Sequence, residues 1–262
     1  MEIKRNIWLV CALLVLLTAC KKETASTTTN LPVVEAYLIP GQAVTVKLYY
    51  QKGLTDTNTY GSPITGQQLT VSNGSTTETL TETASGTYTY SDASFVKTGL
   101  TYSLSFKYLG TTVSASTTVP TKPENFKSLY TSGTVSALDM SARADTLNIY
   151  TWSNPDSLNH VIVFKDTSAL PIAVDARAVG RAVNFELNAK TAASYVVTPG
   201  NFNYSAGYRV ILFRINQEYV NILKSNAAGA NSKDLLNTPT NVVNGLGIFT
   251  AMQGDTLYYR AY

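Results

Sequence analysis

The sequence is poor in the residues that most often build catalytic and metal sites. Its 262 residues include two cysteines, Cys11 and Cys20, and one histidine, His160. A Ser-His-Asp triad or a zinc site would need that histidine, and His160 alternates with Ile162 and Phe164 in a predicted strand, where a structural role is favoured. We therefore expect no enzyme activity, no cofactor and no metal. A hydrolase with two carboxylates far apart in sequence is the third-ranked alternative.

Charged residues are also scarce. They make up 14% of the chain, and the formal net charge is +3. This balance is not that of a nucleic-acid-binding protein, so we expect no nucleic-acid partner. Threonine, serine, tyrosine, valine and asparagine are plentiful instead, which is typical of half-buried strands joined by turns.

Long apolar runs are missing, apart from a short one near the start. Lys4 and Arg5 precede an apolar run over residues 7–17, and small residues follow before Cys20. A transmembrane helix needs about twenty apolar residues, so this run predicts a cleaved signal peptide over residues 1–19. Cys11 would leave with it, so Cys20 would be the single thiol of the mature chain and no disulfide could form within it.

The end of this leader predicts a lipid anchor. The sequence Leu17-Thr18-Ala19-Cys20 resembles the lipobox of bacterial lipoproteins. The resemblance implies a diacylglycerol on the Cys20 sulfur, cleavage after Ala19 and acylation of the new amine, with palmitate as one of the acyl chains. Three such chains hold a domain at a membrane almost permanently. The alternative is an ordinary signal peptide with an incidental cysteine.

A polar tether is predicted over residues 20–31, because these residues offer almost nothing to bury. Its opening, Lys21-Lys22-Glu23, resembles the export signal of outer-membrane lipoproteins in the Bacteroidota, although such signals usually carry two or more acidic residues. We expect an outer-membrane location, with surface display favoured over a periplasm-facing orientation.

Alternating residues predict an immunoglobulin-like β-sandwich over residues 32–120. Val44, Val46, Leu48 and Tyr50 share one strand face, and Asn73-Gly74 predicts a two-residue hairpin turn. Seven short strands in about ninety residues are typical of such a sandwich. The expected strands are 33–39, 44–50, 69–72, 75–80, 86–90, 102–108 and 111–119. Tyr102 is either a tyrosine corner or a simply buried residue.

A second module is predicted over residues 121–262. Pro120 and Pro123 interrupt the strand pattern and indicate a boundary. The opening segments, 147–152 and 160–164, resemble those of a fibronectin type III module with Trp152 in its core. Further strands are expected at 183–187, 195–197, 208–215, 247–251 and 256–262.

One short helix is predicted near residues 216–226. Asn216 can cap it, Glu218 suits its first turn and Lys224 suits its last. Its narrow apolar face favours packing on the second sandwich over a membrane or partner role. The predicted fold is therefore all-β, with two sandwich-like modules and one short helix.

Five stretches carry a family resemblance. They are Val33-Val34-Glu35-Ala36-Tyr37, Gly99-Leu100-Thr101-Tyr102, Thr117-Thr118-Val119-Pro120, Ile215-Asn216-Gln217-Glu218-Tyr219 with Leu223-Lys224-Ser225, and Val243-Asn244-Gly245-Leu246-Gly247-Ile248-Phe249. Together they resemble the Bacteroidota lipoproteins grouped as domain of unknown function 4249. The resemblance implies no catalytic residues. It does imply a role in capture or uptake, because such proteins often occur beside TonB-dependent receptors. For Gly245 and Gly247 we favour backbone geometry over a phosphate loop.

Tyrosines are the candidate binding residues. They offer an apolar ring with a polar tip that could stack on glycans or contact a partner protein, although most are expected to fill core or surface positions. The candidates are Tyr49, Tyr88, Tyr90, Tyr258, Tyr259 and Tyr262. Three Asp-Ser/Thr-apolar sequences resemble bacterial O-glycosylation acceptors, with Thr146, Ser157 and Thr256 as the hydroxyl residues; such pairs are also ordinary turn residues.

The predicted function is a non-enzymatic binding or accessory component, anchored in the outer membrane through Cys20. A TonB-dependent receptor is the expected partner, and the ligand is not indicated. The second-ranked alternative is a structural or adhesive cell-surface protein.

Overall fold

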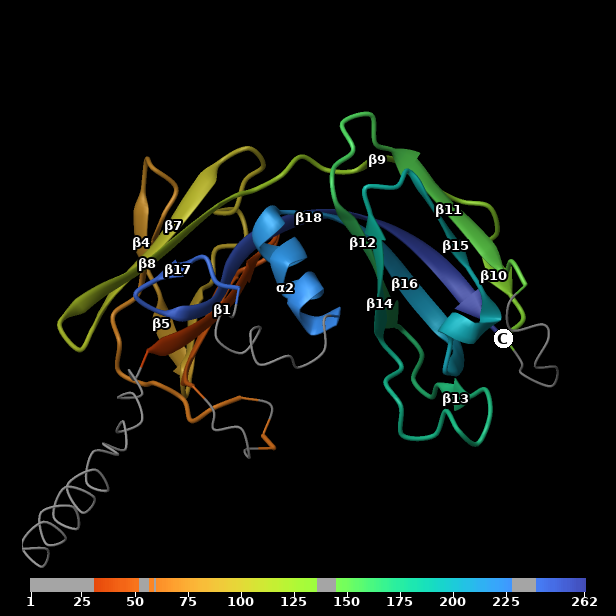
Figure 1. Cartoon of the computed structure of the whole chain (residues 1–262), viewed down its shortest axis with the longest axis horizontal. Helices are drawn as coiled ribbons and strands as arrows, with labels where there is room; N and C mark the ends of the chain where they lie inside the picture. The colour runs from red at the N-terminus through yellow and green to blue at the C-terminus, as the bar shows by residue number, and fades with distance from the viewer. Residues whose placement is uncertain (1–30, 52–56, 59, 136–144, 228–238) are drawn as a thin grey trace, which may run out of the picture. The chain divides into compact units, whose positions relative to one another are not determined.

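The computed structural model describes residues 31–51, 57–58, 60–135, 145–227 and 239–262. These residues form strands joined by turns, with α2 (Gln217–Ala227) and the single 3₁₀ turn η2 (Pro199–Asn201) as the helical elements described (Figure 1). The predicted all-β class with sandwich-like sheets is confirmed. No helix in the described ranges has the length and apolar character needed to cross a membrane.

The first sandwich, as we name it, places two sheets around one core. One sheet has the order β18-β1-β2-β6-β5 and the other the order β17-β8-β7-β3-β4. The strands are β1 (Pro32–Leu38), β2 (Val44–Tyr50), β3 (Thr70–Ser72), β4 (Thr77–Thr79), β5 (Thr81–Ala84), β6 (Thr87–Tyr90), β7 (Thr101–Tyr108), β8 (Thr111–Thr118), β17 (Val242–Val243) and the first part of β18 (Leu246–Ala261).

Period-two alternation builds this core, as expected. Val44, Val46 and Leu48 are fully buried between the sheets, while the residues between them face outward. Tyr102 is a tyrosine corner: its hydroxyl donates to the Phe95 carbonyl at 2.7 Å and accepts from the Lys97 amide at 2.8 Å.

The predicted Asn73-Gly74 turn is displaced by one residue. Ser72 pairs with Thr77, and the Asn73 amide donates to the Thr76 carbonyl at 3.1 Å, so Gly74 and Ser75 form the tip of the hairpin. The Asn73 side-chain oxygen accepts from the Ser75 and Thr76 amides, at 3.0 and 2.9 Å, and these bonds stabilise the turn at its shifted position.

The second sandwich, as we name it, packs a three-stranded sheet, β15-β11-β9, against the sheet β14-β12-β16-β18. Trp152 lies in its core, as predicted. The strands are β9 (Glu124–Ser128), β10 (Ser132–Gly133), β11 (Asn148–Ser153), β12 (His160–Asp166), β13 (Ile172–Ala173), β14 (Phe185–Lys190), β15 (Ser194–Val197), β16 (Tyr204–Ile215) and the last part of β18.

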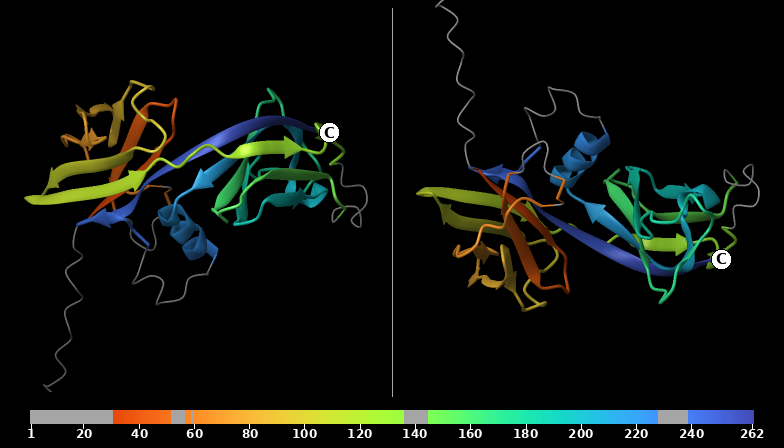
Figure 2. Two further views of the ribbon diagram at one scale, coloured as in Figure 1. Left: turned by 90° about the horizontal axis from the view of Figure 1, so that it is seen from above. Right: turned by 90° about the horizontal axis from the view of Figure 1, so that it is seen from below.

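A single long strand, β18, belongs to both sandwiches. Its residues 246–251 pair in parallel with β1, and its residues 252–261 pair antiparallel with β16. Both views in Figure 2 show β18, in dark blue, continuing from one sandwich into the other. The separate strands expected at 247–251 and 256–262 are therefore one. The division at residue 120 stays a prediction, and the first core also contains Val242, Phe249 and Ala251.

Gly247 is required by the β1–β18 pairing. Its φ is +93°, and a Cβ at this position would lie 2.0 Å from the Val34 carbonyl oxygen. A Cβ on Gly245 would lie 2.8 Å from the Val242 side chain. Both glycines therefore serve backbone geometry, as expected.

The α2 helix covers the outer face of the second sandwich, as predicted. Val220 is buried with Val161, Phe213 and Met252, and Tyr219 and Leu223 pack against the same cluster. The carbonyl of Asn216 accepts the first helical hydrogen bonds. Its side-chain amide donates instead to Thr117 Oγ1 at 3.0 Å and to the Thr118 carbonyl at 2.8 Å, which links the helix to β8.

Candidate functional site

Of the four residues predicted to be modified, the structure describes the three O-glycosylation candidates but not the lipidation residue. Cys20 lies outside the described residues, so lipid attachment there stays a prediction. Thr146, Ser157 and Thr256 are all exposed, on separate segments. Their O-glycosylation also stays a prediction.

The predicted tyrosines do not form one site. Tyr88 and Tyr259 are core residues, and Tyr90 packs against the first core. Tyr258 and Tyr262 are exposed near the end of β18, away from Tyr49 on β2.

His160 is buried and structural. Its Nδ1 lies 2.9 Å from the Leu158 carbonyl, and its ring centroid lies 5.6 Å from that of Trp152. Burial, together with the positive charge of Arg214, lowers the pKa of His160 to about 4. The ring is therefore neutral near pH 7, and it has no contact with solvent through which to serve a substrate.

The candidate site is on the outer face of the first sandwich, where strand alternation directs Lys47 and Tyr49 of β2 away from the core. Lys47 Nζ donates to the Tyr60 hydroxyl at 2.9 Å and lies 4.4 Å from the Tyr60 ring centroid. The Tyr49 and Tyr60 rings meet edge to face at 5.2 Å.

A hollow of about 330 Å³ opens beside these side chains. Segment 60–64 forms its wall, held to β2 by bonds from the Tyr50 amide to the Ser62 carbonyl and from the Ile64 amide to the Leu48 carbonyl. Gly86 lies at its base with φ +66°, and a Cβ there would lie 2.6 Å from the Leu48 carbonyl oxygen. Backbone hydrogen bonds and the absence of a side chain at Gly86 therefore define the shape of the hollow. Its lining residues are Lys47, Leu48, Tyr49, Tyr60, Gly61, Pro63, Ser85, Gly86 and Thr87.

Two further tyrosines extend this surface toward α2. The Tyr37 ring on β1 contacts the Tyr219 ring edge to face, with centroids 6.0 Å apart. The Tyr219 hydroxyl donates to Glu186 Oε2 at 2.7 Å. We name the set Tyr37, Tyr49, Tyr60, Tyr219 and Lys47 the tyrosine face.

A cation and a carboxylate, Lys47 and Glu35, set the electrostatics of this face. Burial and the Glu35 carboxylate raise the pKa of Tyr49 to about 12, and the same two causes raise the pKa of Tyr37. The hydrogen bond to Tyr60 raises the pKa of Lys47. Near pH 7 the phenols of Tyr37 and Tyr49 are therefore protonated, beside the Lys47 cation and the Glu35 carboxylate.

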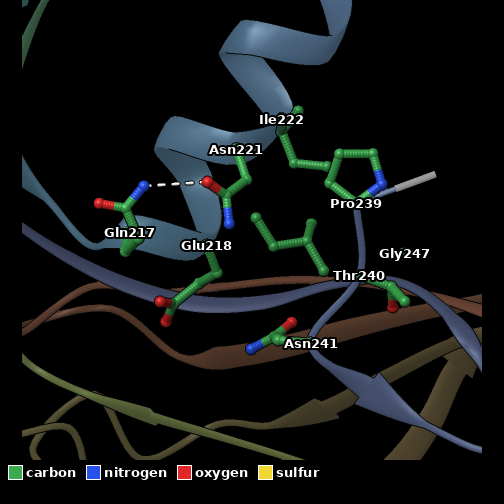
Figure 3. Close-up of a pocket in the computed structure, with 9 residues that line it drawn as sticks. Gln217, Glu218, Asn221, Ile222, Pro239, Thr240, Asn241 and Gly247 are labelled. Atoms are coloured by element: carbon green, nitrogen blue, oxygen red, sulfur yellow. Dashed lines mark hydrogen bonds between the residues drawn. The ribbon is translucent and has the colours of Figure 1, made fainter. Parts of the chain in front are cut away.

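A second hollow, of about 230 Å³, lies between α2 and residues 239–248 (Figure 3). Gln217 Nε2 donates to Asn221 Oδ1 at 2.9 Å on the helix side. Across the hollow, the side-chain amide of Asn241 makes two hydrogen bonds to the backbone of Phe249 on β18. Its Nδ2 donates to the Phe249 carbonyl at 2.7 Å, and its Oδ1 accepts from the Phe249 amide at 3.0 Å. Ile248 also lines this hollow.

Sequence reasoning named Tyr49 but missed its partners. Tyr37 and Lys47 were readable as outward positions of alternating strands. Tyr60 and Tyr219 were not, because a loop residue and a helix residue reach this face only through the tertiary fold. Among the described residues, no cluster of three or more His, Cys, Asp or Glu side chains is placed to hold a metal ion.

Comparison with solved structures finds partial similarity. The chicken CNTN1 FN1-FN3 domains match at 15% identity with a TM-score of 0.28, covering 71% of this chain and 59% of that one. Trypsin-activated alpha-2-macroglobulin from Escherichia coli matches at 13% identity with a TM-score of 0.22, covering 72% of this chain and 14% of that one. The chain thus spans less than two thirds of either structure.

A search of curated proteins found no match. The family comparison, in contrast, covers most of the sequence: the model described as domain of unknown function (DUF4249) matches residues 21–257. That range includes β1, the tyrosine face, α2 and all of β18 except its last four residues. The chain therefore belongs to the DUF4249 family, as its resemblance to that family predicted.

Proposed function

We propose that this protein is a non-enzymatic binding component, anchored in the outer membrane through lipidated Cys20, that serves a TonB-dependent uptake system. The observation that supports binding is the tyrosine face, with its hollow held open by backbone hydrogen bonds. Aromatic rings that keep a hydroxyl exposed are common where proteins contact glycans or other proteins. Tyr37, Lys47 and Tyr49 are on paired strands, which position these three side chains more rigidly than a loop would.

The partner is tested by co-purification. From membranes of the source cell, the tagged protein should recover a TonB-dependent receptor. The double variant Tyr49→Ala, Tyr60→Ala should recover at least about tenfold less, which corresponds to about 1.4 kcal/mol of binding free energy.

The matched control is Tyr258→Ala, Tyr262→Ala, which removes two exposed tyrosines elsewhere and should leave recovery unchanged. A clean purification without any receptor would count against an uptake role and would favour the structural or adhesive alternative.

Anchoring is tested at Cys20. Cys20→Ser should abolish labelling by radioactive palmitate and release the protein from membranes, because the thioether and the acyl chains can no longer be added. Cys11→Ser is the control, since Cys11 lies within the expected signal peptide, and it should be labelled normally. Retained palmitate on the Cys20→Ser protein would refute the proposed anchor.

A further inference from the structure

The connection between β12 and β14, residues 167–184, contains β13 (Figure 1). It carries three exposed aliphatic side chains. Leu170 is 86% exposed, Ile172 is 69% exposed and Val179 is 69% exposed. Singly scattered apolar residues are ordinary on protein surfaces, whereas a group of them on one segment is a candidate contact surface.

This connection is held in a defined conformation. Ile172 pairs with Ser205 of β16, and the Val174 amide donates to the Asn203 carbonyl at 3.0 Å. Asp175 Oδ1 accepts from the Arg177 and Ala178 amides, at 2.8 and 3.0 Å. The backbone therefore keeps Leu170, Ile172 and Val179 directed to solvent, although Ala178 beside them is buried.

Positive charge accompanies the apolar side chains. Residues 167–183 contain two arginines, Arg177 and Arg181, and one acidic residue, Asp175, which pairs with Arg177 at 2.9 Å. A hollow of about 130 Å³ is lined by Asp175, Arg177, Ala178, Arg181 and Asn203. Its two arginines outnumber its one carboxylate, so the lining has a net positive charge that suits an anionic group.

We propose that the 167–184 connection contacts an anionic lipid surface, with Leu170, Ile172 and Val179 entering the interface and Arg181 meeting headgroup phosphates. The aliphatic side chains favour lipid over protein, because protein interfaces concentrate tyrosine, tryptophan and arginine and all three exposed apolar residues here are aliphatic. Arginine suits both kinds of surface, and on a lipid surface it meets the headgroups. This contact is separate from the acyl anchor at Cys20 and from the tyrosine face, so it holds or fails independently of the proposed function.

The test uses residues 21–262, which lack the leader and the lipidated cysteine and retain all three hydrophobic clusters. Vesicles of phosphatidylethanolamine and phosphatidylglycerol at 3:1 are the probe, and flotation measures binding. The chain should float with these vesicles and should bind pure phosphatidylcholine vesicles at least tenfold more weakly. Leu170→Asp, Ile172→Asp should reduce binding to the anionic vesicles at least tenfold, and Arg181→Gln should reduce it several-fold.

The matched control is Leu109→Asp. Leu109 is 79% exposed on the β7–β8 turn with φ +47°, a conformation that aspartate tolerates. This variant should bind vesicles like the unchanged chain. Equal loss in the control, or no binding by the unchanged chain, would overturn the proposal.

A label locates the contact. Residues 21–262 contain no cysteine, so Leu170→Cys and Leu109→Cys each carry one environment-sensitive fluorophore. Vesicles should shift the emission of the label at position 170 to the blue and leave that at position 109 unchanged. An unshifted label at 170 on vesicle-bound protein would overturn the proposal, as would vesicle-free dimerisation that buries it.

Discussion

The two sandwiches fill their interiors with different side chains. The first core is mainly aliphatic, with residues such as Val34, Val46, Leu69 and Leu104 between its sheets. The second core is a network of ring contacts around Phe164, which stacks on Phe185 with centroids 4.5 Å apart. Rings reach across a wide gap with few residues, so the second sandwich can be filled from fewer strand positions.

The two cores also differ in how many of their buried polar side-chain atoms have a hydrogen-bond partner. In the first core the Tyr88 hydroxyl donates to the Ile64 carbonyl at 2.9 Å, and Tyr102 has two backbone partners. In the second core Trp152 Nε1, His160 Nε2 and the Tyr259 hydroxyl are buried without a hydrogen-bond partner among the described residues. The second core also contains one tyrosine bonded to backbone, since the Tyr208 hydroxyl donates to the Tyr204 carbonyl at 3.0 Å. The difference is therefore one of degree: the second core leaves more of its buried polar ring atoms without a partner and depends more on ring packing.

The largest expected effect on stability comes from a substitution in β18, the strand that the two cores share. Gly247→Ala should lower the free energy of unfolding by at least about 4 kcal/mol, because the Val34 carbonyl must move and the β1–β18 pairing with it. Denaturant unfolding should be followed by Trp152 fluorescence, which reports the second sandwich, and by circular dichroism, which reports both.

Gly74→Ala is its control. That glycine has a similar φ of +87° with open space around it, so only the backbone penalty of about 1–2 kcal/mol is expected. If the Gly247→Ala protein is as stable as the Gly74→Ala protein, the close approach of Gly247 to Val34 does not constrain the β1–β18 pairing.

The next largest effect is acid sensitivity of the second sandwich. His160 is the single histidine, with a pKa of about 4 when folded and about 6.5 when unfolded. Between these values the unfolded chain binds more protons, so stability falls as pH drops from 6.5 to 4, by about 3 kcal/mol at most.

Melting temperatures measured from pH 7 to pH 4 should show this loss. The variant His160→Gln should flatten the profile, because it removes the titrating ring. A profile that is equally steep in the variant would assign the loss to carboxylates instead.

The smallest effect compares two tyrosine hydroxyls. Tyr102→Phe should cost about 1–3 kcal/mol, because the Phe95 carbonyl and the Lys97 amide lose their partner. Tyr259→Phe should change stability by less than about 0.5 kcal/mol, because its hydroxyl makes no hydrogen bond to the described residues. Chemical denaturation of both variants measures the difference, and equal costs would show that the two cores treat hydroxyls alike.

Local patterns predicted most of the first sandwich. Alternation located β2, β7 and β8 to within a residue or two, because each strand has one buried and one exposed face. The α2 helix was predicted for a similar reason, from its apolar face and end residues.

Pairings between distant residues were not predictable in this way. Two strands were expected at 247–251 and 256–262, and Gly254 lies in the interval between them, inside the continuous strand β18. The structure explains this glycine by the close approach of β16, because a Cβ there would lie 2.7 Å from Ile211 Cγ2. The tyrosine face was missed in part for the same reason, since Tyr60 and Tyr219 reach Tyr49 and Tyr37 only when the chain is folded.

Asn241 has a consequence for how copies of this protein coexist at high concentration. Where β18 pairs with β1, its other side would present the amide and carbonyl of Phe249 to any passing chain, and the Asn241 side chain already satisfies both groups. The Ala251 amide is satisfied in the same way by Thr117 Oγ1 at 3.0 Å. These side chains thus take the hydrogen-bonding positions that a neighbouring strand would occupy. They leave no unpaired backbone group at Phe249 or at the Ala251 amide for edge-to-edge aggregation and fibre growth.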